Sequence, residues 1–342
     1  MIGATKNWLG GGFNGRIFDH ITSVQNLFRA WKEFKKGKNK KTDIITFALN
    51  LENNIFSLRD ELISGSWICG GYKKFSIKDP KPRIIHKAIV RDRLLYQAIY
   101  QVLYPIFDET FIFDSYSSRN GKGIHAGVKR LSVFLQKLSK NYTKPVYALK
   151  CDIKKFFDSI DHIVLLDLIK EKVDCQYTLK LIEKVISSFQ KSPEKGLPLG
   201  NVTSQIFANV YMNNFDWYIK RNLDIKYYLR YNDDFVILSS DKNTLVHNIR
   251  YIVCYLNSNL KLSLHPDKIL IRKLYQGIDF LGAVLLPHRI VIRTKTKKRI
   301  LKKVFHTKDL QVIESYLGHI SHTKSSKIRR EILTKKRMLT LK

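Results

Sequence analysis

Two short segments decide the fold expected for this chain: CDIKKFFDSID at residues 151–161 and RYNDDFVILSS at residues 230–240. Each contains an apolar run that is typical of a strand, together with carboxylates that a buried strand would not be expected to carry. Asp152 ends the first run, and Asp233 and Asp234 lie side by side within the second. Adjacent aspartates are common in exposed turns, but a turn is not expected inside such an apolar run. We therefore expect three carboxylates on rigid strand ends.

Carboxylates held in this way are suited to binding two divalent cations. Two such cations stabilise the attacking and leaving oxygens of an in-line phosphoryl transfer, and Mg²⁺ prefers oxygen ligands of this kind. The sequence therefore predicts Asp152, Asp233 and Asp234 as metal ligands. The alternative for Asp152 is that it caps a following helix, a role that Asp158 or Asp161 would fill better.

The charge of the chain points to a polyanionic partner. The 342 residues include 61 Lys and Arg but 29 Asp and Glu, which gives a net charge of +32. Nucleic acid is the first candidate for a partner of such a protein, and the aromatic residues, at 12%, add surface on which bases can stack. The alternative, a cationic protein that is merely soluble, would not need so large an excess.

Cysteine spacing and hydropathy exclude other classes. The four cysteines include no CxxC pair, so the spacing of a zinc site is absent, and we expect buried free thiols in a reducing cytosol. The first twenty residues lack the apolar core of a signal peptide. No apolar stretch approaches the roughly 18 residues of a membrane span. These patterns predict a soluble intracellular protein with no membrane partner.

Hydrophobic periodicity predicts alternating blocks of helices and strands. Helices are expected over 21–38, 43–64, 90–103, 124–140, 161–172, 176–190, 202–222 and 241–260. Strands are expected over 72–77, 83–86, 145–151, 226–231, 234–239, 268–272 and 278–285. From residue 286 onward, 17 Lys or Arg stand against 3 acidic residues, and this tail is expected to form two or three short basic helices. The order predicts an α+β body with a basic helical appendage.

Seven segments between residues 75 and 290 are informative because of the order in which they follow one another along the chain. They are KPRIIHKAIVRDRLLYQAI (81–99), DSYSSRNGKGIHAGVKRL (114–131), CDIKKFFDSIDH (151–162), GLPLGNVTSQIFANVYMNNFD (196–216), RYNDDFVIL (230–238), LKLSLHPDKILI (260–271) and GIDFLGAVL (277–285). This order resembles the two fingers motifs and palm motifs A to E of reverse transcriptases of the non-LTR, bacterial type. The resemblance implies a right-hand polymerase with an N-terminal helical extension (1–75), fingers and an antiparallel palm (76–285), and a small basic helical thumb (286–342).

The resemblance also implies an activity and its cofactors. It predicts an RNA-directed DNA polymerase, a nucleotidyltransferase that makes cDNA from dNTPs and holds template RNA and the RNA–DNA hybrid. Two Mg²⁺ ions, or Mn²⁺ in their place, would be held by the three aspartates and the backbone carbonyl of Ile153. Lys268 could donate a proton to the leaving pyrophosphate; the alternative is an ordinary surface lysine.

Other residues are expected to contact the incoming nucleotide. By resemblance, Phe157 is the steric gate that selects deoxynucleotides, and its alternative is a plain core phenylalanine. Arg83, with Lys81 as a second choice, offers cations to the triphosphate. Leu199 and Gly200 precede the motif B helix, where glycine permits close approach of the backbone.

The basic tail is expected to grip the template–primer backbone. Its densest run lies within nine residues and consists of Lys295, Lys297, Lys298, Arg299, Lys302 and Lys303. Lysines and arginines that neutralise phosphates are the usual source of such affinity. A solvated helical face is the alternative for any basic run, and the position after the palm favours a thumb.

Motif B narrows the resemblance to the reverse transcriptases of diversity-generating retroelements. The chain has Leu199-Gly200-Asn201 and Ser204-Gln205 where retron and group II intron enzymes usually have Gln-Gly and Ser-Pro. Family members copy a template-repeat RNA with misincorporation opposite adenines, for mutagenic retrohoming, and usually bind a small basic accessory variability protein. The resemblance implies the cytoplasm of a bacterium, with a bacterial or phage gene. Asn232 departs from the family, which more often has an apolar residue there.

Two other functions are weighed against this one. A retron-like or antiphage reverse transcriptase would make a fixed, non-mutagenic cDNA, and motif B argues against it. A non-catalytic RNA-binding protein could use a dead polymerase fold, but all three carboxylates are present.

Overall fold

The computed structural model describes residues 16–77, 82–321, 323 and 325–340, and the chain divides into two compact units that are described separately. The first unit comprises Met1–Ile112, Lys154–Asp216 and Leu256–Leu262. The second comprises Phe113–Ile153, Trp217–Tyr255 and Ser263–Lys342.

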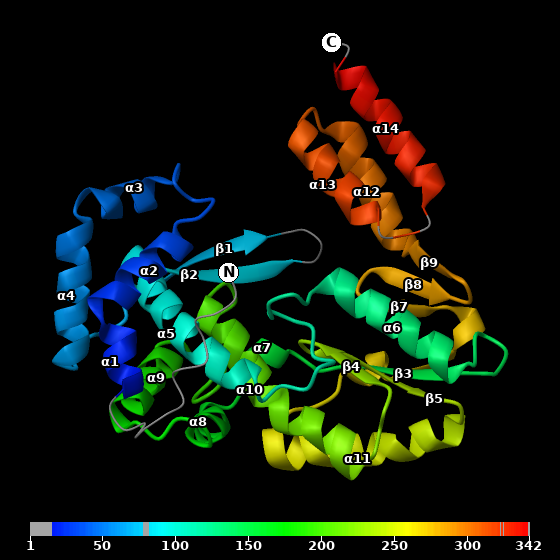
Figure 1. Cartoon of the computed structure of the whole chain (residues 1–342), viewed down its shortest axis with the longest axis horizontal. Helices are drawn as coiled ribbons and strands as arrows, with labels where there is room; N and C mark the ends of the chain where they lie inside the picture. The colour runs from blue at the N-terminus through cyan, green and yellow to red at the C-terminus, as the bar shows by residue number, and fades with distance from the viewer. Residues whose placement is uncertain (1–15, 78–81, 322, 324, 341–342) are drawn as a thin grey trace, which may run out of the picture. The chain divides into compact units, whose positions relative to one another are not determined.

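The first unit is mainly helical and carries one hairpin (Figure 1). The hairpin pairs β1 (Tyr72–Ile77) with β2 (Arg83–Ala88) in antiparallel register. The helices are α1 (Arg16–Thr22), α2 (Val24–Phe34), α3 (Thr42–Leu49), α4 (Leu51–Ile63), α5 (Val90–Asp108), α7 (Phe156–Ser159), α8 (His162–Lys170), α9 (Gln176–Ser187) and α10 (Val202–Trp217). The buried Asn26 amide joins α2 to α5 by donating from Nδ2 to the Ala98 carbonyl at 3.2 Å.

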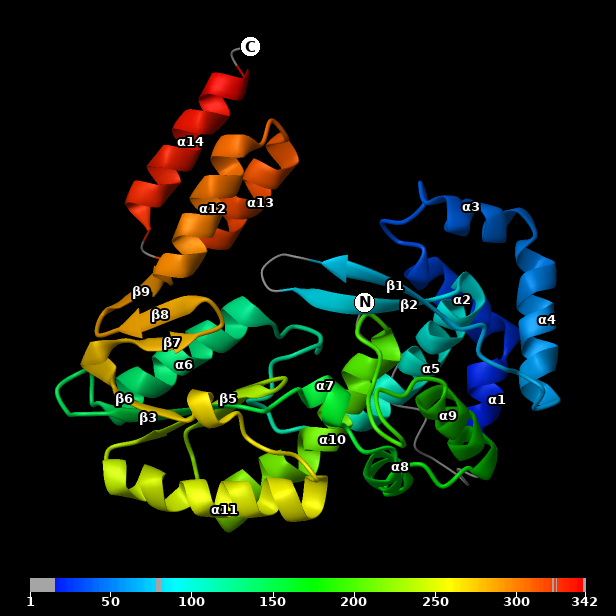
Figure 2. The same cartoon turned by 180° about the vertical axis from the view of Figure 1, so that it is seen from behind.

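The second unit is built on a four-stranded antiparallel sheet in the order β4-β5-β3-β6. Its strands are β3 (Tyr147–Asp152), β4 (Tyr228–Tyr231), β5 (Asp234–Ser239) and β6 (Leu270–Lys273). Helix α6 (Ile124–Leu138) packs on one face through Val128, Leu131 and Leu135. Helix α11 (Lys242–Leu260) lies across the other face, as Figures 1 and 2 show. Residues Tyr218–Asn222 form one π-helical turn that continues α10.

A second sheet and three helices complete this unit. The sheet has the order β7-β8-β9, with β7 (Ile278–Phe280), β8 (Ala283–Leu286) and β9 (Arg289–Ile292). Helices α12 (Thr294–His306), α13 (Leu310–Ile320) and α14 (Ser326–Thr340) follow. They share an apolar core of their own, formed by Ile292, Ile300, Val304, Ile313, Ile320, Ile328 and Ile332. The tail therefore folds around its own interior, with basic residues left for its surface.

The structure confirms the α+β class and corrects several boundaries. The strand expected over 278–285 is wrong, because Leu281 and Gly282 both have positive φ (50° and 86°) and reverse the chain between β7 and β8. Strand β9 was not expected. The helix expected over 21–38 divides at Ser23, whose hydroxyl accepts from the Asn26 N–H and starts α2. The helix expected over 43–64 divides at Asn50.

The expectation of buried thiols holds for only part of the cysteines. Cys151 and Cys175 are buried, whereas Cys69 is half-buried and Cys254 is exposed. Cys254 is exposed because it lies on the outer side of α11, away from the buried Ile252 and Leu256. Across the described ranges, no helix is both long and apolar enough to cross a bilayer.

Asp161 stabilises the start of α8. Its carboxylate is buried, accepts from the Val164 N–H at 3.2 Å and pairs with the Lys261 ammonium at 2.9 Å. Burial by itself would raise the pKa of Asp161, but the bonds from Lys261 and the Val164 N–H outweigh burial and lower the pKa. The charged form is therefore the one that the fold stabilises.

We expect Asp161→Ala to lower the free energy of unfolding by about 1–2 kcal/mol at neutral pH, because a helix cap and an ion pair are lost. Asp161→Asn should lose less, since asparagine still caps. A folded-state pKa below the unfolded value means that the contribution is present above the unfolded pKa and is lost as the pH falls through the folded pKa. Urea denaturation of wild type and Asp161→Asn at neutral and acid pH measures this; a stability difference that persists in acid would contradict it.

Candidate active site

The second unit brings two of the predicted carboxylates to the same end of its sheet. Asp152 on β3 and Asp234 on β5 are direct partners in the antiparallel register. Asp233 lies beside them in the two-residue turn Asn232–Asp233 that joins β4 to β5. Asn232 has φ of 59°, a left-handed conformation that asparagine adopts more readily than branched apolar residues do. This turn explains why asparagine is suitable at a position where an apolar residue was the family expectation.

Backbone bonds hold this end of the sheet. The Ile153 N–H donates to the Asp233 carbonyl at 3.1 Å, and the His265 N–H donates to the Asp152 carbonyl at 2.8 Å. The buried Arg230 guanidinium donates to the Asn232 carbonyl at 3.1 Å from within β4. The turn and both strand ends are thereby fixed to one another, which is what a preorganised site requires.

Two lysines neutralise the carboxylates. The Lys268 ammonium lies 2.6 Å from Asp152 Oδ1, and the Lys150 ammonium lies 3.3 Å from Asp234 Oδ2. Lys268, predicted as a proton donor, is thus placed at the carboxylates. Sequence reasoning did not single out Lys150, although side chains alternate along a strand and residues two apart share a face. Lys150 is two residues before Asp152, and this spacing could have indicated that the lysine lies on the same face of the sheet as the carboxylate.

The Asp234 carboxyl is largely buried and has a raised pKa. Burial raises its pKa to about 6, with the Lys150 cation acting in the opposite direction and the neighbouring Asp152 and Asp233 charges adding to the rise. Its Oδ1 is buried and has no hydrogen-bond partner among the described residues. A buried carboxylate oxygen without a partner is costly unless a proton or a cation reaches it.

These donors fit divalent cations. Hard cations such as Mg²⁺ take carboxylate oxygens as ligands, and the orphan oxygen of Asp234 is a ligand that the protein itself leaves unused. Among the residues that the structure describes, however, no three acidic, histidine or cysteine side chains converge into one metal-ligand group. The strand ends therefore supply the donors, and their side chains are held by lysines instead of by one another.

The predicted nucleotide contacts lie in the first unit. Phe157 in α7 is half-buried and packs edge-on against the buried Phe156, with ring centroids 5.5 Å apart. Its carbonyl accepts from the Leu197 N–H at 2.8 Å, so α7 is tied to the loop that precedes α10. Phe156 is the core residue of the pair, which leaves part of the Phe157 ring available for contact.

The loop before α10 is also tied to the hairpin. The Leu199 carbonyl accepts from the His86 N–H of β2 at 3.0 Å. Gly200 has φ of 113°, and a Cβ there would meet Ile85 Cγ2 at 2.8 Å. A side chain at this position would therefore be strained and crowded, so glycine permits the close approach of loop and strand.

Of the two cations expected to bind the triphosphate, only Arg83 lies within the described residues. Arg83 begins β2, pairs in register with Ile77 and is exposed. Lys81 lies outside the described residues. Arg91 and Arg93, at the start of α5, form ion pairs with Glu61 and Asp43, each at 2.7 Å.

All six basic residues predicted for the thumb lie on α12. Lys295, Lys298, Lys302 and Lys303 are exposed, whereas Lys297 and Arg299 are half-buried. Ile300 and Val304 occupy the opposite side of the same helix and are buried in its apolar core. The helix is therefore amphipathic, with a cationic outer face.

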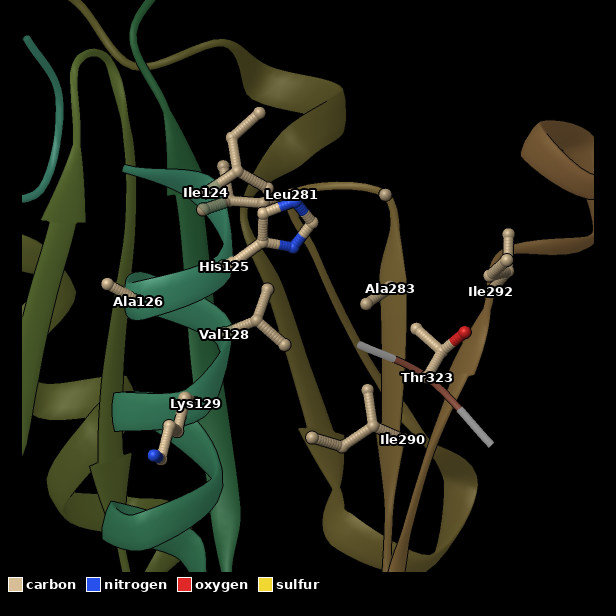
Figure 3. A pocket seen from close by; sticks show the side chains of 11 residues that line it. Ile124, His125, Ala126, Val128, Lys129, Leu281, Ala283, Ile290, Ile292 and Thr323 are labelled. Carbon is tan, nitrogen blue, oxygen red and sulfur yellow. The ribbon is translucent and has the colours of Figure 1, made fainter. Parts of the chain in front are cut away.

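A cavity of about 340 Å³ lies elsewhere in the second unit, between α6 and the strands β8 and β9. Figure 3 shows Val128, Ala283 and Ile290 pointing into it, with His125 and Leu281 together at one end. Its lining is mainly apolar and includes none of the predicted site residues. We assign it no part in the chemistry.

Comparisons with known proteins agree with this geometry. Residues 73–285, well over half of the chain, match the family described as reverse transcriptase (RNA-dependent DNA polymerase). Protein YkfC of Escherichia coli (strain K12) is 26% identical over 273 residues, which cover 68% of this chain and 71% of that protein. Group II intron-encoded protein LtrA of Lactococcus lactis subsp. cremoris is 25% identical over 135 residues, or 37% of this chain and 21% of LtrA.

A solved structure supports the fold. Apo telomerase from Candida Tropicalis superposes with a TM-score of 0.51 at 14% identity, covering 80% of this chain and 57% of that one. This chain thus spans little more than half of the telomerase and about a fifth of LtrA. Reverse transcriptases synthesise DNA on template RNA with divalent metal ions, which the carboxylate strand ends suit. The chain belongs to the reverse transcriptase (RNA-dependent DNA polymerase) family.

Proposed function

We propose that this RNA-directed DNA polymerase is the enzyme of a diversity-generating retroelement. In this role it copies a template-repeat RNA into cDNA with misincorporation directed to adenines, and the cDNA serves mutagenic retrohoming. The observation that carries the proposal is Leu199-Gly200-Asn201 with Ser204-Gln205 at the start of α10. Leu199 is half-buried there, and its side chain offers bulk without a hydrogen bond.

The site residues take the following roles in this proposal. Asp152, Asp233 and Asp234, with the Ile153 carbonyl, hold two Mg²⁺ ions, for which Mn²⁺ can substitute. Lys268 protonates the leaving pyrophosphate; its ammonium already lies 2.6 Å from Asp152. At the incoming dNTP, Phe157 excludes the ribose 2′-hydroxyl, Arg83 and Lys81 bind the triphosphate, and Leu199 and Gly200 line the approach.

The proposed division of the chain follows the same reasoning. Residues 1–75 form an N-terminal helical extension, 76–285 the fingers and palm, and 286–342 a basic thumb. The separate apolar core of α12–α14 supports the last boundary. The exposed lysines of α12 bind the phosphates of the RNA–DNA hybrid. A small basic accessory protein is the proposed partner, in the bacterial cytoplasm.

Replacing Leu199 tests the mutagenic role. A glutamine at this position can hydrogen-bond near the incoming nucleotide, and each tenfold gain in discrimination needs only about 1.4 kcal/mol. We therefore expect high misincorporation opposite template adenine in the wild type, and lower misincorporation, by about tenfold, in Leu199→Gln and Leu199→Asn.

The measurement is sequencing of cDNA made by wild type and variants on one RNA. Errors opposite template guanine, cytosine and uracil serve as the internal control and should change less than errors opposite adenine. An equally low adenine error rate in wild type and variants would remove the mutagenic role. It would leave the alternative, a retron-like or antiphage reverse transcriptase that makes a fixed cDNA.

A further inference from the structure

The base of the β1–β2 hairpin is held by a chain of hydroxyl groups. Tyr72 begins β1, and its hydroxyl lies 3.0 Å from the Tyr96 hydroxyl of α5 and 2.9 Å from the Ser188 hydroxyl at the end of α9. The Ser188 hydroxyl also donates to the Val185 carbonyl at 2.7 Å. Because its one proton is used there, Ser188 must accept from Tyr72, and Tyr72 must accept from Tyr96. Burial raises the pKa of Tyr72 to about 12, so its hydroxyl keeps the proton that it donates.

Aromatic packing holds the same end of the hairpin. The Tyr72 ring packs edge-on against Phe189, with ring centroids 5.6 Å apart. The His86 ring of β2 packs edge-on against the same phenylalanine, at 4.6 Å. Both strands therefore rest on the residues that end α9, and the hydroxyl chain fixes how β1 lies on them.

The path by which the chain enters β1 is also fixed. The fully buried Asp92 carboxylate accepts from the Gly70 N–H at 2.7 Å and from the Trp67 indole N–H at 3.3 Å. A Cβ at Gly70 would collide with the side chain of Ile89, so the backbone lies close against the start of α5. The two residues before Tyr72 are thus held on the side of the hairpin from which it projects.

The outer part of the hairpin is exposed. Residues 73–77 of β1 are exposed to solvent, as are Arg83 and Ile84 at the start of β2. Arg83 pairs with Ile77, five residues beyond Tyr72, which at about 3.4 Å per residue is roughly 17 Å from the base. A small tilt at the base is therefore enlarged at Arg83. Misplacement by about 1 Å of a group that holds a substrate can cost about 100-fold in rate.

We propose that Tyr72 is a positioning residue for the incoming dNTP. Its hydroxyl, fixed between Tyr96 and Ser188, sets the direction of the hairpin so that Arg83 meets the triphosphate. Tyr72 acts through Arg83 and does not itself touch the nucleotide. This role rests on the triphosphate contact proposed above for Arg83, and it is independent of the mutagenic function.

The test is a double-mutant cycle of Tyr72 and Arg83, measured by steady-state primer extension with the full chain on one RNA template–primer. We expect Arg83→Ala to raise the KM for dNTP by at least about tenfold, because a charge-assisted contact is lost. Tyr72→Phe keeps the ring against Phe189 and should raise the same KM by about fivefold, with kcat changed by less than about twofold. In the Arg83→Ala background, Tyr72→Phe should add less than about twofold, because its effect passes through Arg83.

Two further variants separate positioning from stability. Ser188→Ala removes the acceptor of the Tyr72 proton and should raise the KM as Tyr72→Phe does. Tyr211→Phe is the matched control, because the buried Tyr211 hydroxyl donates to the Leu260 carbonyl at 2.6 Å, away from the hairpin. It should lower the melting temperature and leave the KM for dNTP unchanged.

The outcomes distinguish the two roles. An unchanged KM in Tyr72→Phe, with a raised KM in Arg83→Ala, would overturn the positioning role and leave that of Arg83 intact. An equal rise with and without Arg83, or a rise of the same size in Tyr211→Phe, would also overturn it, because the hydroxyl would then act through general stability. An unchanged KM in Arg83→Ala would remove the triphosphate role of Arg83 and, with it, the positioning role of Tyr72.

Discussion

Asp233→Asn is expected to abolish primer extension on an RNA template. The substitution keeps the size of the side chain and removes the charge that a divalent cation requires. Metal ions contribute several kcal/mol of transition-state stabilisation, and about 1.4 kcal/mol corresponds to a factor of ten. The rate should therefore fall by at least about 100-fold at saturating Mg²⁺ and dNTPs.

The fold should survive this change. Asp233 lies in the turn between β4 and β5, where its backbone carbonyl, not its side chain, accepts from the Ile153 N–H. Asp267→Asn is the matched control, because that carboxylate belongs to the same unit but is 88% exposed, and it should extend primers as the wild type does. Circular dichroism of both variants checks folding. Extension by Asp233→Asn at the wild-type rate would exclude the metal-ligand role, whereas failure of the wild type itself to extend primers would favour an RNA-binding protein with an inactive polymerase fold.

Phe157→Ala is expected to weaken the choice between deoxyribonucleotides and ribonucleotides. The Phe157 ring is half-buried, and removing it opens space that a 2′-hydroxyl can enter. We expect the ratio of kcat/KM for dNTP over rNTP to fall by about tenfold or more, because a steric exclusion is removed. Phe157→Val should give a smaller change, since valine fills part of the space.

Phe156→Leu controls for damage to the core. Phe156 is buried against Phe157, so this variant should lower stability and leave the dNTP/rNTP ratio unchanged. Single-nucleotide incorporation on one template–primer, with each nucleotide titrated separately, gives both constants. If Phe157→Ala and Phe156→Leu lose stability alike and discriminate as the wild type does, Phe157 is a core residue and not a gate.

Local patterns in the sequence determined the elements that carry the site. The apolar runs that end in Asp152 and begin at Asp234 are strands β3 and β5, and the two strands expected over 72–77 and 83–86 are β1 and β2. Periodicity and turn residues are local properties, so these predictions needed no partner. One exception is the reversal at Leu281–Gly282, where a continuous apolar run concealed two strands. Both strands are largely buried, and burial alone gives the same apolar pattern for one long strand as for two short ones.

Only the tertiary structure decided which residues meet. The register that sets Asp152 opposite Asp234 depends on pairing between strands far apart in the chain, and a shift of one residue would turn each side chain to the other face. The Lys150 and Lys268 ion pairs follow from that register and from β6 beside β3.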